Sequence, residues 1–363
     1  MRDNEYINFG DGLIIWHFHS LAEKYIPDQT MRDLIMKLLN ANVQGDLQEK
    51  IKGIAVASIG NTDFRSFSDT EERQVQEAKL ILFLSKIAKT NTAILGSGAD
   101  GWTLSTSENF EPVYQNFEVG NDHIAERAGY IINVGIGGYK INEKKFYKPS
   151  HVVISPFGLS FDKELLGQLL RLRKNNGKRL FRRIVRATEL LFQAYYNNTN
   201  VSRNARILLI AAAFETLLDL EEPARKSFKD CVEKYCDIPG EAKYRHYYYS
   251  YGRANRDKNK SMKVLWADSF FQLRNQIIHG DVVPERMYQF QSGDRHLDIS
   301  VLFFTQLVKS LINERSSDQK PFADQMEWKQ RKDKSTGFHF EDGSLSVSLS
   351  KFFKDSQKRK VKQ

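Results

Sequence analysis

The sequence has little that would mark a secreted, membrane-bound or zinc-stabilised protein. Only two of its 363 residues are cysteine, which is too few for a disulfide framework, and a set of four Cys and His zinc ligands at the usual spacing is absent. No apolar run approaches the ~20 residues that span a bilayer, and the N-terminal segment lacks the features of a signal peptide. We therefore expect a cytoplasmic protein with reduced thiols and no membrane contact.

Common cofactor motifs are also missing. The chain has no G-x-x-x-x-G-K-[ST] loop, which argues against a P-loop nucleotidase. His17 and His19 would face the same side of a strand, but no nearby carboxylate or cysteine completes a metal site. We expect neither a metal nor an organic cofactor.

Length and composition indicate a folded chain of about two domains. Hydrophobic residues make up 41% and aromatic residues 12% of the sequence, which is enough to build real cores. Compact domains usually hold ~100–200 residues, so a chain of 363 residues is long enough for two.

The net charge of +9 is concentrated in three basic strips. The first has eight basic and no acidic residues, and the others carry a net charge of +5 each; they span residues 171–186, 241–263 and 351–363. The remainder of the chain therefore carries a net charge of −9. Such strips attract a polyanion such as nucleic acid, although lysine and arginine also simply solvate helix faces, and we leave the C-terminal strip uninterpreted.

Residues 1–160 predict an α+β domain, which we expect to be a sensor or regulatory domain. Short apolar runs typical of strands alternate here with amphipathic helices. Ser68 and Glu71 have the spacing of a capping box, which marks a helix N-terminus. The expected strands span 12–19 and 51–60, and the expected helices span 30–41 and 71–88.

Residues 161–314 predict an all-α bundle, because glycines become rare and apolar residues recur every three or four positions. A long loop is expected over 238–261, and a polar, basic, loosely held tail over 315–363. The expected helices span 178–196, 203–220, a stretch that begins near Pro223, 262–279 and 295–314.

The segment FFQLRNQIIHGD (270–281) combines side chains that can carry chemistry. At ~100° per residue, Arg274 and His279 would lie about 140° apart around an ideal helix and could border one cleft at a frayed helix end. Asn275 could orient either a ligand or the histidine. Ile277 and Ile278 are apolar, so we expect that side of the turn to be anchored in the core.

This segment resembles a known family. Arginine, a polar residue, three further residues and histidine near the end of a bundle helix are similar to the R-x(4–6)-H motif of HEPN ("higher eukaryotes and prokaryotes nucleotide-binding") domains. The sequence RNQIIHG and the apolar helix AAAFETLLDL, which contains Glu215, resemble the Apea-like branch of HEPN domains. The resemblance covers roughly residues 178–314, which is under half of the chain.

The resemblance implies a metal-independent endoribonuclease that acts as a homodimer with a composite active site. RNA carries its own nucleophile, the 2′-OH, so such an enzyme needs only to move protons and stabilise charge. His279 would be the general acid/base, Arg274 the clamp on the phosphoryl oxygens, and Asn275 the group that positions them. Glu215 is a candidate for orienting Arg274. The products would carry 2′,3′-cyclic phosphate and 5′-OH ends.

Each of these residues also has a purely structural interpretation. Arg274 would then cap its helix through solvent contacts, and His279 would satisfy a local carbonyl group. Glu215 would be a polar residue on the exposed stripe of an amphipathic helix.

Two groups of residues are candidates for RNA binding. Arg179, Arg182, Arg183 and Arg186 recur at three- and four-residue spacing, so they form one exposed stripe that is either a substrate track or a solvated helix face. The second strip interleaves tyrosines that can stack on bases with arginines that can bind phosphates, or else it packs on the bundle. The candidates in that strip are Tyr247, Tyr249, Arg253 and Arg256.

Three functions follow from these patterns. The first is a ribonuclease effector, a bacterial toxin or phage-defence protein, whose N-terminal domain reads a regulatory partner or phage trigger. The second is a non-catalytic HEPN module that binds nucleotide or a partner protein. The third is a helical interaction domain with no role in RNA binding.

Overall fold

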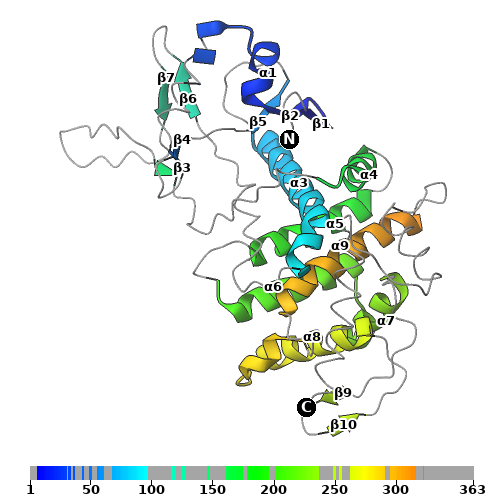
Figure 1. The fold of residues 1–363 in the computed structure, drawn as a ribbon. Coiled ribbons are helices and arrows are strands. Elements are labelled where there is room, and N and C mark those ends of the chain that lie inside the picture. The colour runs from blue at the N-terminus through cyan, green and yellow to red at the C-terminus, as the bar shows by residue number, and fades with distance from the viewer. Residues whose placement is uncertain are drawn as a thin grey trace. The chain divides into compact units, whose positions relative to one another are not determined.

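A computed structural model of the chain divides into two compact units, which are described separately below (Figure 1). The first unit comprises Met1–Lys79 and Glu108–Ser160, and the second comprises Leu80–Ser107 and Phe161–Gln363. The structure describes residues 6–30, 32–33, 36, 43–44, 49–50, 55–60, 68–96, 116–119, 124–127, 145–146, 161–174, 178–195, 201–236, 248–250, 253–255, 262–290, 295–315 and 322.

The first unit contains a three-stranded antiparallel sheet in the order β1-β2-β5. The strands are β1 (Tyr6–Gly10), β2 (Leu13–His17) and β5 (Ala55–Ile59). A tight turn with positive φ at Gly10, Asp11 and Gly12 joins the first two strands. The strand predicted over 12–19 is thus present but shorter, since helix α1 (Phe18–Tyr25) begins directly after His17.

This early helix start shows that the prediction of His17 and His19 on the same side of one strand is wrong. His17 ends β2, whereas His19 lies in α1, so the two residues do not share one face of a strand. The remaining short strands of the unit are β3 (Val43–Gln44), β4 (Glu49–Lys50), β6 (Asn116–Val119), β7 (Ile124–Arg127) and β8 (Lys145–Phe146).

Helix α3 (Asp69–Gly96) contains the boundary between the units. The predicted capping box is present at its start, where the Ser68 N–H donates to Glu71 Oε2 over 2.8 Å. The helix continues eight residues beyond the predicted end at 88. Its residues from Leu80 to Ile87 belong to the second unit and are buried there.

The second unit is helical, as the apolar periodicity predicts (Figure 1). Its helices are α4 (Lys163–Lys174), α5 (Lys178–Ala194), α6 (Arg203–Leu218), α7 (Ala224–Tyr235), α8 (Met262–Ile278) and α9 (His296–Arg315). The chain is therefore a small sheet-containing region followed by a mostly helical one. The predicted long loop over 238–261 is wrong in part, because β9 (Tyr248–Ser250) and β10 (Arg253–Asn255) form a hairpin there.

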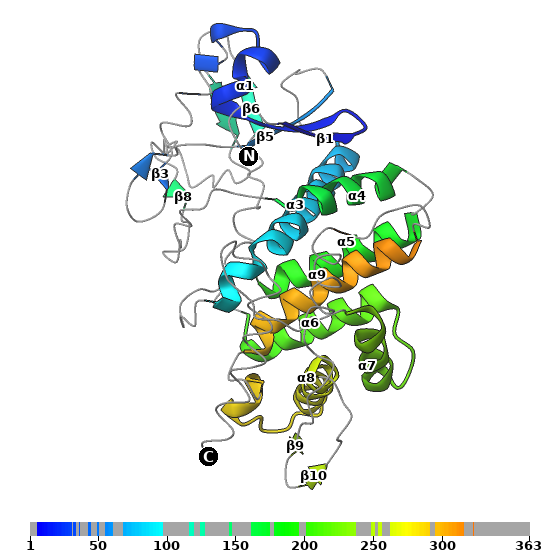
Figure 2. The same cartoon turned by 45° about the vertical axis from the view of Figure 1, so that its right-hand side comes forward.

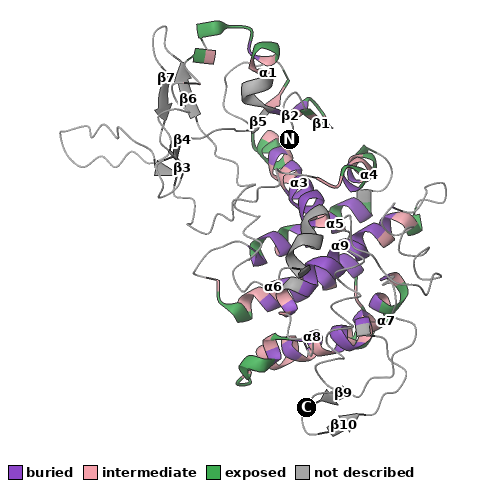
Figure 3. Cartoon of the chain, in the orientation of Figure 1, coloured by how far each residue is buried: buried purple, intermediate pink, exposed green. Residues whose placement is uncertain are grey.

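Helix α6 lies between α5, α8 and α9 (Figure 1, Figure 2). It begins at Ser202, whose hydroxyl accepts a hydrogen bond from the Ala205 N–H over 3.2 Å. Figure 3 shows buried residues where α5, α6, α8 and α9 face one another, and exposed residues at the end of α8.

The core around α6 is aromatic. The Phe214 ring lies within 6.1 Å, centroid to centroid, of four other rings that come from α7, α8 and α9. These four rings belong to Phe228, Trp266, Phe270 and Phe304. All five side chains are fully buried, so this cluster holds the four helices together.

A buried carboxylate joins α7 to α8. Asp268 accepts two hydrogen bonds from Arg225, at 3.0 and 2.8 Å, and pairs with Lys229 Nζ at 2.9 Å. Burial alone would raise the pKa of Asp268, but the hydrogen bonds from both cations outweigh it and lower that pKa. The contact therefore ties α7 to α8, the helix that carries Arg274 and ends next to His279.

His296 lies fully buried among aromatic rings at the start of α9. Its ring centroid is 5.9 Å from that of Phe270 and 6.2 Å from that of Phe290. Nε2 lies 3.5 Å from Ser269 Oγ, and Nδ1 has no hydrogen-bond partner among the described residues. Burial lowers the pKa of His296 to about 3, because a charged imidazole would lose its hydration there.

Lowering the pH from 7 to 5 is therefore expected to lower the unfolding free energy by about 2 kcal/mol, because of His296. The folded chain keeps this imidazole neutral, while the unfolded chain protonates it near the ordinary pKa of 6.5. The contribution is complete above pH 6.5 and is lost as the pH falls towards 3. Urea unfolding of the wild type and His296→Gln at both pH values measures it; an equal pH dependence of the two would contradict the assignment.

Beyond α9, Phe322 is buried within the segment that was expected to be a loosely held tail. Lys309 Nζ lies 5.3 Å from the centroid of its ring and 2.7 Å from Asp162 Oδ2. Asp162 in turn caps α4 by accepting the Leu165 N–H over 3.0 Å. In the described part of the chain, no helix combines the length and the apolar character needed to cross a membrane.

Candidate active site

The guanidinium of Arg274 is held by three neighbours. Nη2 donates to Glu215 Oε1 over 2.8 Å, and Nη1 donates to Asn275 Oδ1 over 3.1 Å. Cζ lies 6.0 Å from the centroid of the Phe271 ring. The side chain is 25% exposed, so the guanidinium is fixed in direction yet reachable from solvent.

The contact with Glu215 joins two helices. Glu215 lies in the last turn of α6 and directly follows the buried Phe214, so core packing determines where its carboxylate points. The structure thus places Glu215 in contact with Arg274, while its role in orienting the guanidinium stays a prediction. It is also half-buried, with 31% of its side chain exposed.

His279 directly follows α8, in an exposed turn. The Gly280 N–H donates to Ile277 O over 3.1 Å and the Asp281 N–H donates to Gln276 O over 3.0 Å, the two bonds of a Schellman motif. This arrangement makes His279 the C-cap residue and places Gly280 in the left-handed region, at φ +76°. In the part of the chain that the structure describes, the His279 imidazole has no hydrogen-bond or ion-pair partner.

Replacing Gly280 tests this turn. A Cβ added at Gly280 meets nothing within 4 Å, so Gly280→Ala is expected to cost about 1 kcal/mol through the left-handed φ alone. Asparagine, which tolerates this conformation, is expected to cost less. Gly167 of α4 is the matched control: it also has open space, but without positive φ, so Gly167→Ala is expected to stabilise the protein by about 0.5–1 kcal/mol. Equal effects at both sites in urea unfolding would contradict the turn geometry.

The apolar residues beside His279 are exposed rather than anchored. Ile278 is 51% exposed and Ile277 is half-buried, so the prediction that both sit in the core is wrong. Val282, on the far side of the turn, is 95% exposed. The helix has already passed the core at this point, and the Schellman turn directs the chain away from it.

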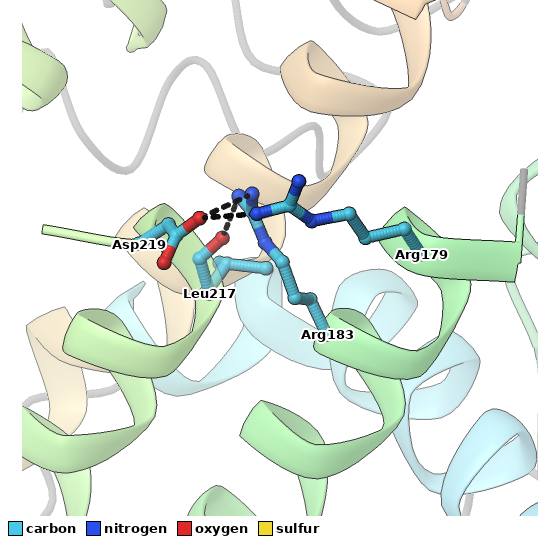
Figure 4. Close-up of polar contacts among 4 residues, drawn as sticks. All are labelled: Arg179, Arg183, Leu217 and Asp219. Atoms are coloured by element: carbon cyan, nitrogen blue, oxygen red, sulfur yellow. Dashed lines mark hydrogen bonds and ion pairs between the residues drawn. The ribbon is translucent and has the colours of Figure 1, made fainter.

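The basic stripe of α5 is partly used within the chain. Arg179 and Arg183 converge on Asp219 Oδ2 at 3.3 and 3.5 Å (Figure 4). Arg183 Nη2 also donates to the carbonyl oxygen of Leu217 over 2.5 Å and so caps the C-terminus of α6. Arg183 therefore differs from the expected exposed stripe, whereas Arg179, Arg182 and Arg186 are exposed.

Two of the four candidates in the second basic strip, residues 241–263, lie among the described residues. Tyr249 lies in β9 opposite Ala254, and Arg253 lies in β10 opposite Ser250. The other two, Tyr247 and Arg256, lie outside the described residues. The role of all four in RNA binding stays a prediction.

The described residues contain no cluster of three or more His, Cys, Asp or Glu side chains arranged as metal ligands. Cys231 and Cys236 form no disulfide with each other, and Cys236 is buried directly after α7. Burial raises the pKa of Cys231, with a smaller contribution from Asp230. Both therefore behave as packing residues.

The site also contains parts that the sequence motif does not reveal. Phe271 supplies a ring face beneath Arg274, and its only signal in the sequence is a place one turn before the arginine. Arg203, Glu285 and Tyr288 form a cluster beyond the His279 turn, and no short-range pattern connects residues more than 80 positions apart. Comparison of the chain with known protein families, curated proteins and solved structures found no match.

Proposed function

We propose that this chain is a metal-independent endoribonuclease of the HEPN type. The observation that carries the proposal is that one helix end presents both a fixed, solvent-reachable Arg274 and an exposed His279, whose imidazole has no partner among the described residues. These are the two groups that RNA cleavage by the 2′-OH requires, namely a mobile proton carrier and a permanent positive charge.

The reaction needs only these side chains and the RNA itself. His279 takes the proton from the 2′-OH, whose oxygen attacks the neighbouring phosphorus. The bond from phosphorus to the 5′-oxygen then breaks, and that oxygen receives a proton from an imidazolium. The products are a 2′,3′-cyclic phosphate and a 5′-hydroxyl.

Arg274 is suited to stabilise the charge that builds on the phosphoryl oxygens. A guanidinium has five N–H groups, and the bonds to Glu215 and Asn275 use two of them. The remaining N–H groups can reach two phosphoryl oxygens at once. Glu215 and Asn275 thus hold the guanidinium and still leave N–H groups that can bind phosphate.

We further propose that the active form is a homodimer. In the arrangement that the HEPN resemblance implies, two copies of the motif face each other, so that one His279 can act as the base and the other as the acid. The exposed Ile278 and Val282 border the motif and supply apolar surface for such contact. A toxin or phage-defence role, with the first unit reading a trigger, follows from the same resemblance.

The test is cleavage of end-labelled RNA by the purified chain in EDTA. Cleavage with cyclic phosphate ends is expected for the wild type and is expected to be lost in His279→Ala and Arg274→Ala. Equal cleavage by all three proteins would overturn the site. If the wild type binds nucleotide but does not cut, the non-catalytic module is correct instead. Sedimentation as a monomer at the assay concentration would overturn the dimer.

A further inference from the structure

The segment that follows His279 is anchored a second time, at the first turn of α6. A short 3₁₀-helix, η3 (Glu285–Tyr288), lies six residues beyond His279. Arg203 forms an ion pair with Glu285, and its Cζ lies 4.6 Å from the centroid of the Tyr288 ring. The Tyr288 hydroxyl donates a hydrogen bond to the side chain of Asn204.

Buried apolar side chains attach the same segment to the core. Met287 and Phe290 are 7% and 3% exposed, and the Phe290 ring lies edge-on to His296, with the ring centroids 6.2 Å apart. Polar contacts to Arg203 and Asn204 thus hold one side of the segment, and apolar contacts hold the other. Only the short stretch between Gly280 and Pro284 connects this fixed segment to the His279 turn.

Helix α6 consequently contacts both Arg274 and the segment that follows His279. Glu215, near its C-terminal end, holds Arg274, while Arg203, in its first turn, holds the segment that leads away from His279. Twelve residues of helix separate these two contacts, a rigid span of about 18 Å. A single helix can therefore set the distance between the guanidinium and the imidazole.

From this geometry we infer that Arg203 is a positioning residue for His279, acting through Glu285, Tyr288 and the turn at Gly280. The inference rests on the proposed ribonuclease function. Arg203 does not touch the reacting groups. It fixes the far end of the segment, so that the turn carrying His279 keeps one conformation while RNA binds.

Because the ion pair between Arg203 and Glu285 is exposed, its effect on the position of His279 can be measured apart from its effect on folding stability. The side chains of Arg203 and Glu285 are 42% and 77% exposed, and ion pairs this exposed contribute little to folding. Loss of Arg203 is therefore expected to leave the unfolding midpoint nearly unchanged. Its effect should instead appear in the local opening of the turn.

The test compares Arg203→Gln with Lys234→Gln, a matched control. Lys234 also pairs with a carboxylate, that of Glu314 at 2.9 Å, and also lies over a tyrosine ring, that of Tyr235 at 4.3 Å, but it lies on α7. For Arg203→Gln we expect about tenfold faster hydrogen exchange at the Gly280 and Asp281 amides and about tenfold lower kcat with KM unchanged. Arg203→Lys should recover part of both effects, and Lys234→Gln should show neither.

The two readouts separate this inference from the function on which it rests. Unchanged exchange at the two amides in Arg203→Gln would overturn the anchor, whether or not the wild type cuts RNA. Faster exchange with an unchanged kcat would overturn the positioning role. A wild type that does not cut RNA would overturn the ribonuclease function, and faster exchange in Arg203→Gln would then still support the anchor.

Discussion

Replacing His279 with alanine is expected to lower kcat for RNA cleavage by about 10²–10⁴-fold, the usual contribution of a general acid/base. The effect should fall on kcat, because the imidazole moves protons in the transition state and contributes little to holding the RNA backbone. Folding should be unaffected within about 0.5 kcal/mol, since the residue is exposed at a helix end. Single-turnover cleavage and urea unfolding measure the two quantities.

The exposed position of His279 allows a sharper control. Free imidazole can reach the space that the alanine variant leaves, so it should restore part of the lost rate in His279→Ala. It should not restore Arg274→Ala, which lacks a charge rather than a proton carrier. A His279→Ala variant that cuts RNA at the wild-type rate would remove this residue from the mechanism.

Replacing Phe214 with alanine is expected to lower the unfolding free energy by about 3–5 kcal/mol. Its ring is fully buried and lies against four aromatic rings, so truncation leaves a cavity that several rigid neighbours border. Urea unfolding monitored by tryptophan fluorescence measures this loss. Trp266, 6.1 Å from Phe214, is itself a reporter of the cavity.

The position of Phe214 connects this loss to the site. Because Glu215 is the next residue, a relaxed α6 should also misplace the carboxylate that holds Arg274. Phe214→Leu, which keeps most of the volume, should lose clearly less stability. Val282→Ala, at a 95% exposed position, is the control and should change the unfolding free energy by less than about 0.5 kcal/mol. Similar losses for Phe214→Ala and Val282→Ala would contradict the packing described for α6.

The helices of the second unit were predictable from local sequence, often to within two residues. The prediction of 203–220 corresponds to Arg203–Leu218, and that of 262–279 corresponds to Met262–Ile278. Both have strong local signals, a serine cap in the first case and a glycine after the last turn in the second. Helix α4 is not among the predicted helices, because its last turn runs into the basic strip that begins at residue 171.

The side-chain partners were not predictable, because they come from distant parts of the chain. Arg183 is one of four regularly spaced arginines, yet it donates to the Leu217 carbonyl oxygen at the end of α6, 34 positions away. Ile278 is apolar and helical, yet it is exposed because α8 extends past its neighbours. Periodicity reports which face of a helix is apolar, but it does not report where the neighbouring helices stop.

The contact between Phe322 and Lys309 determines how the protein can be shortened for study. A chain that stops at Arg315, where α9 ends, would lose the ring that lies 5.3 Å from Lys309 Nζ, in a side chain that is only 3% exposed. Water would then reach the ion pair between Lys309 and Asp162, which tethers the start of α4 to α9. The C-terminal boundary of a stable fragment is therefore expected to lie beyond residue 322.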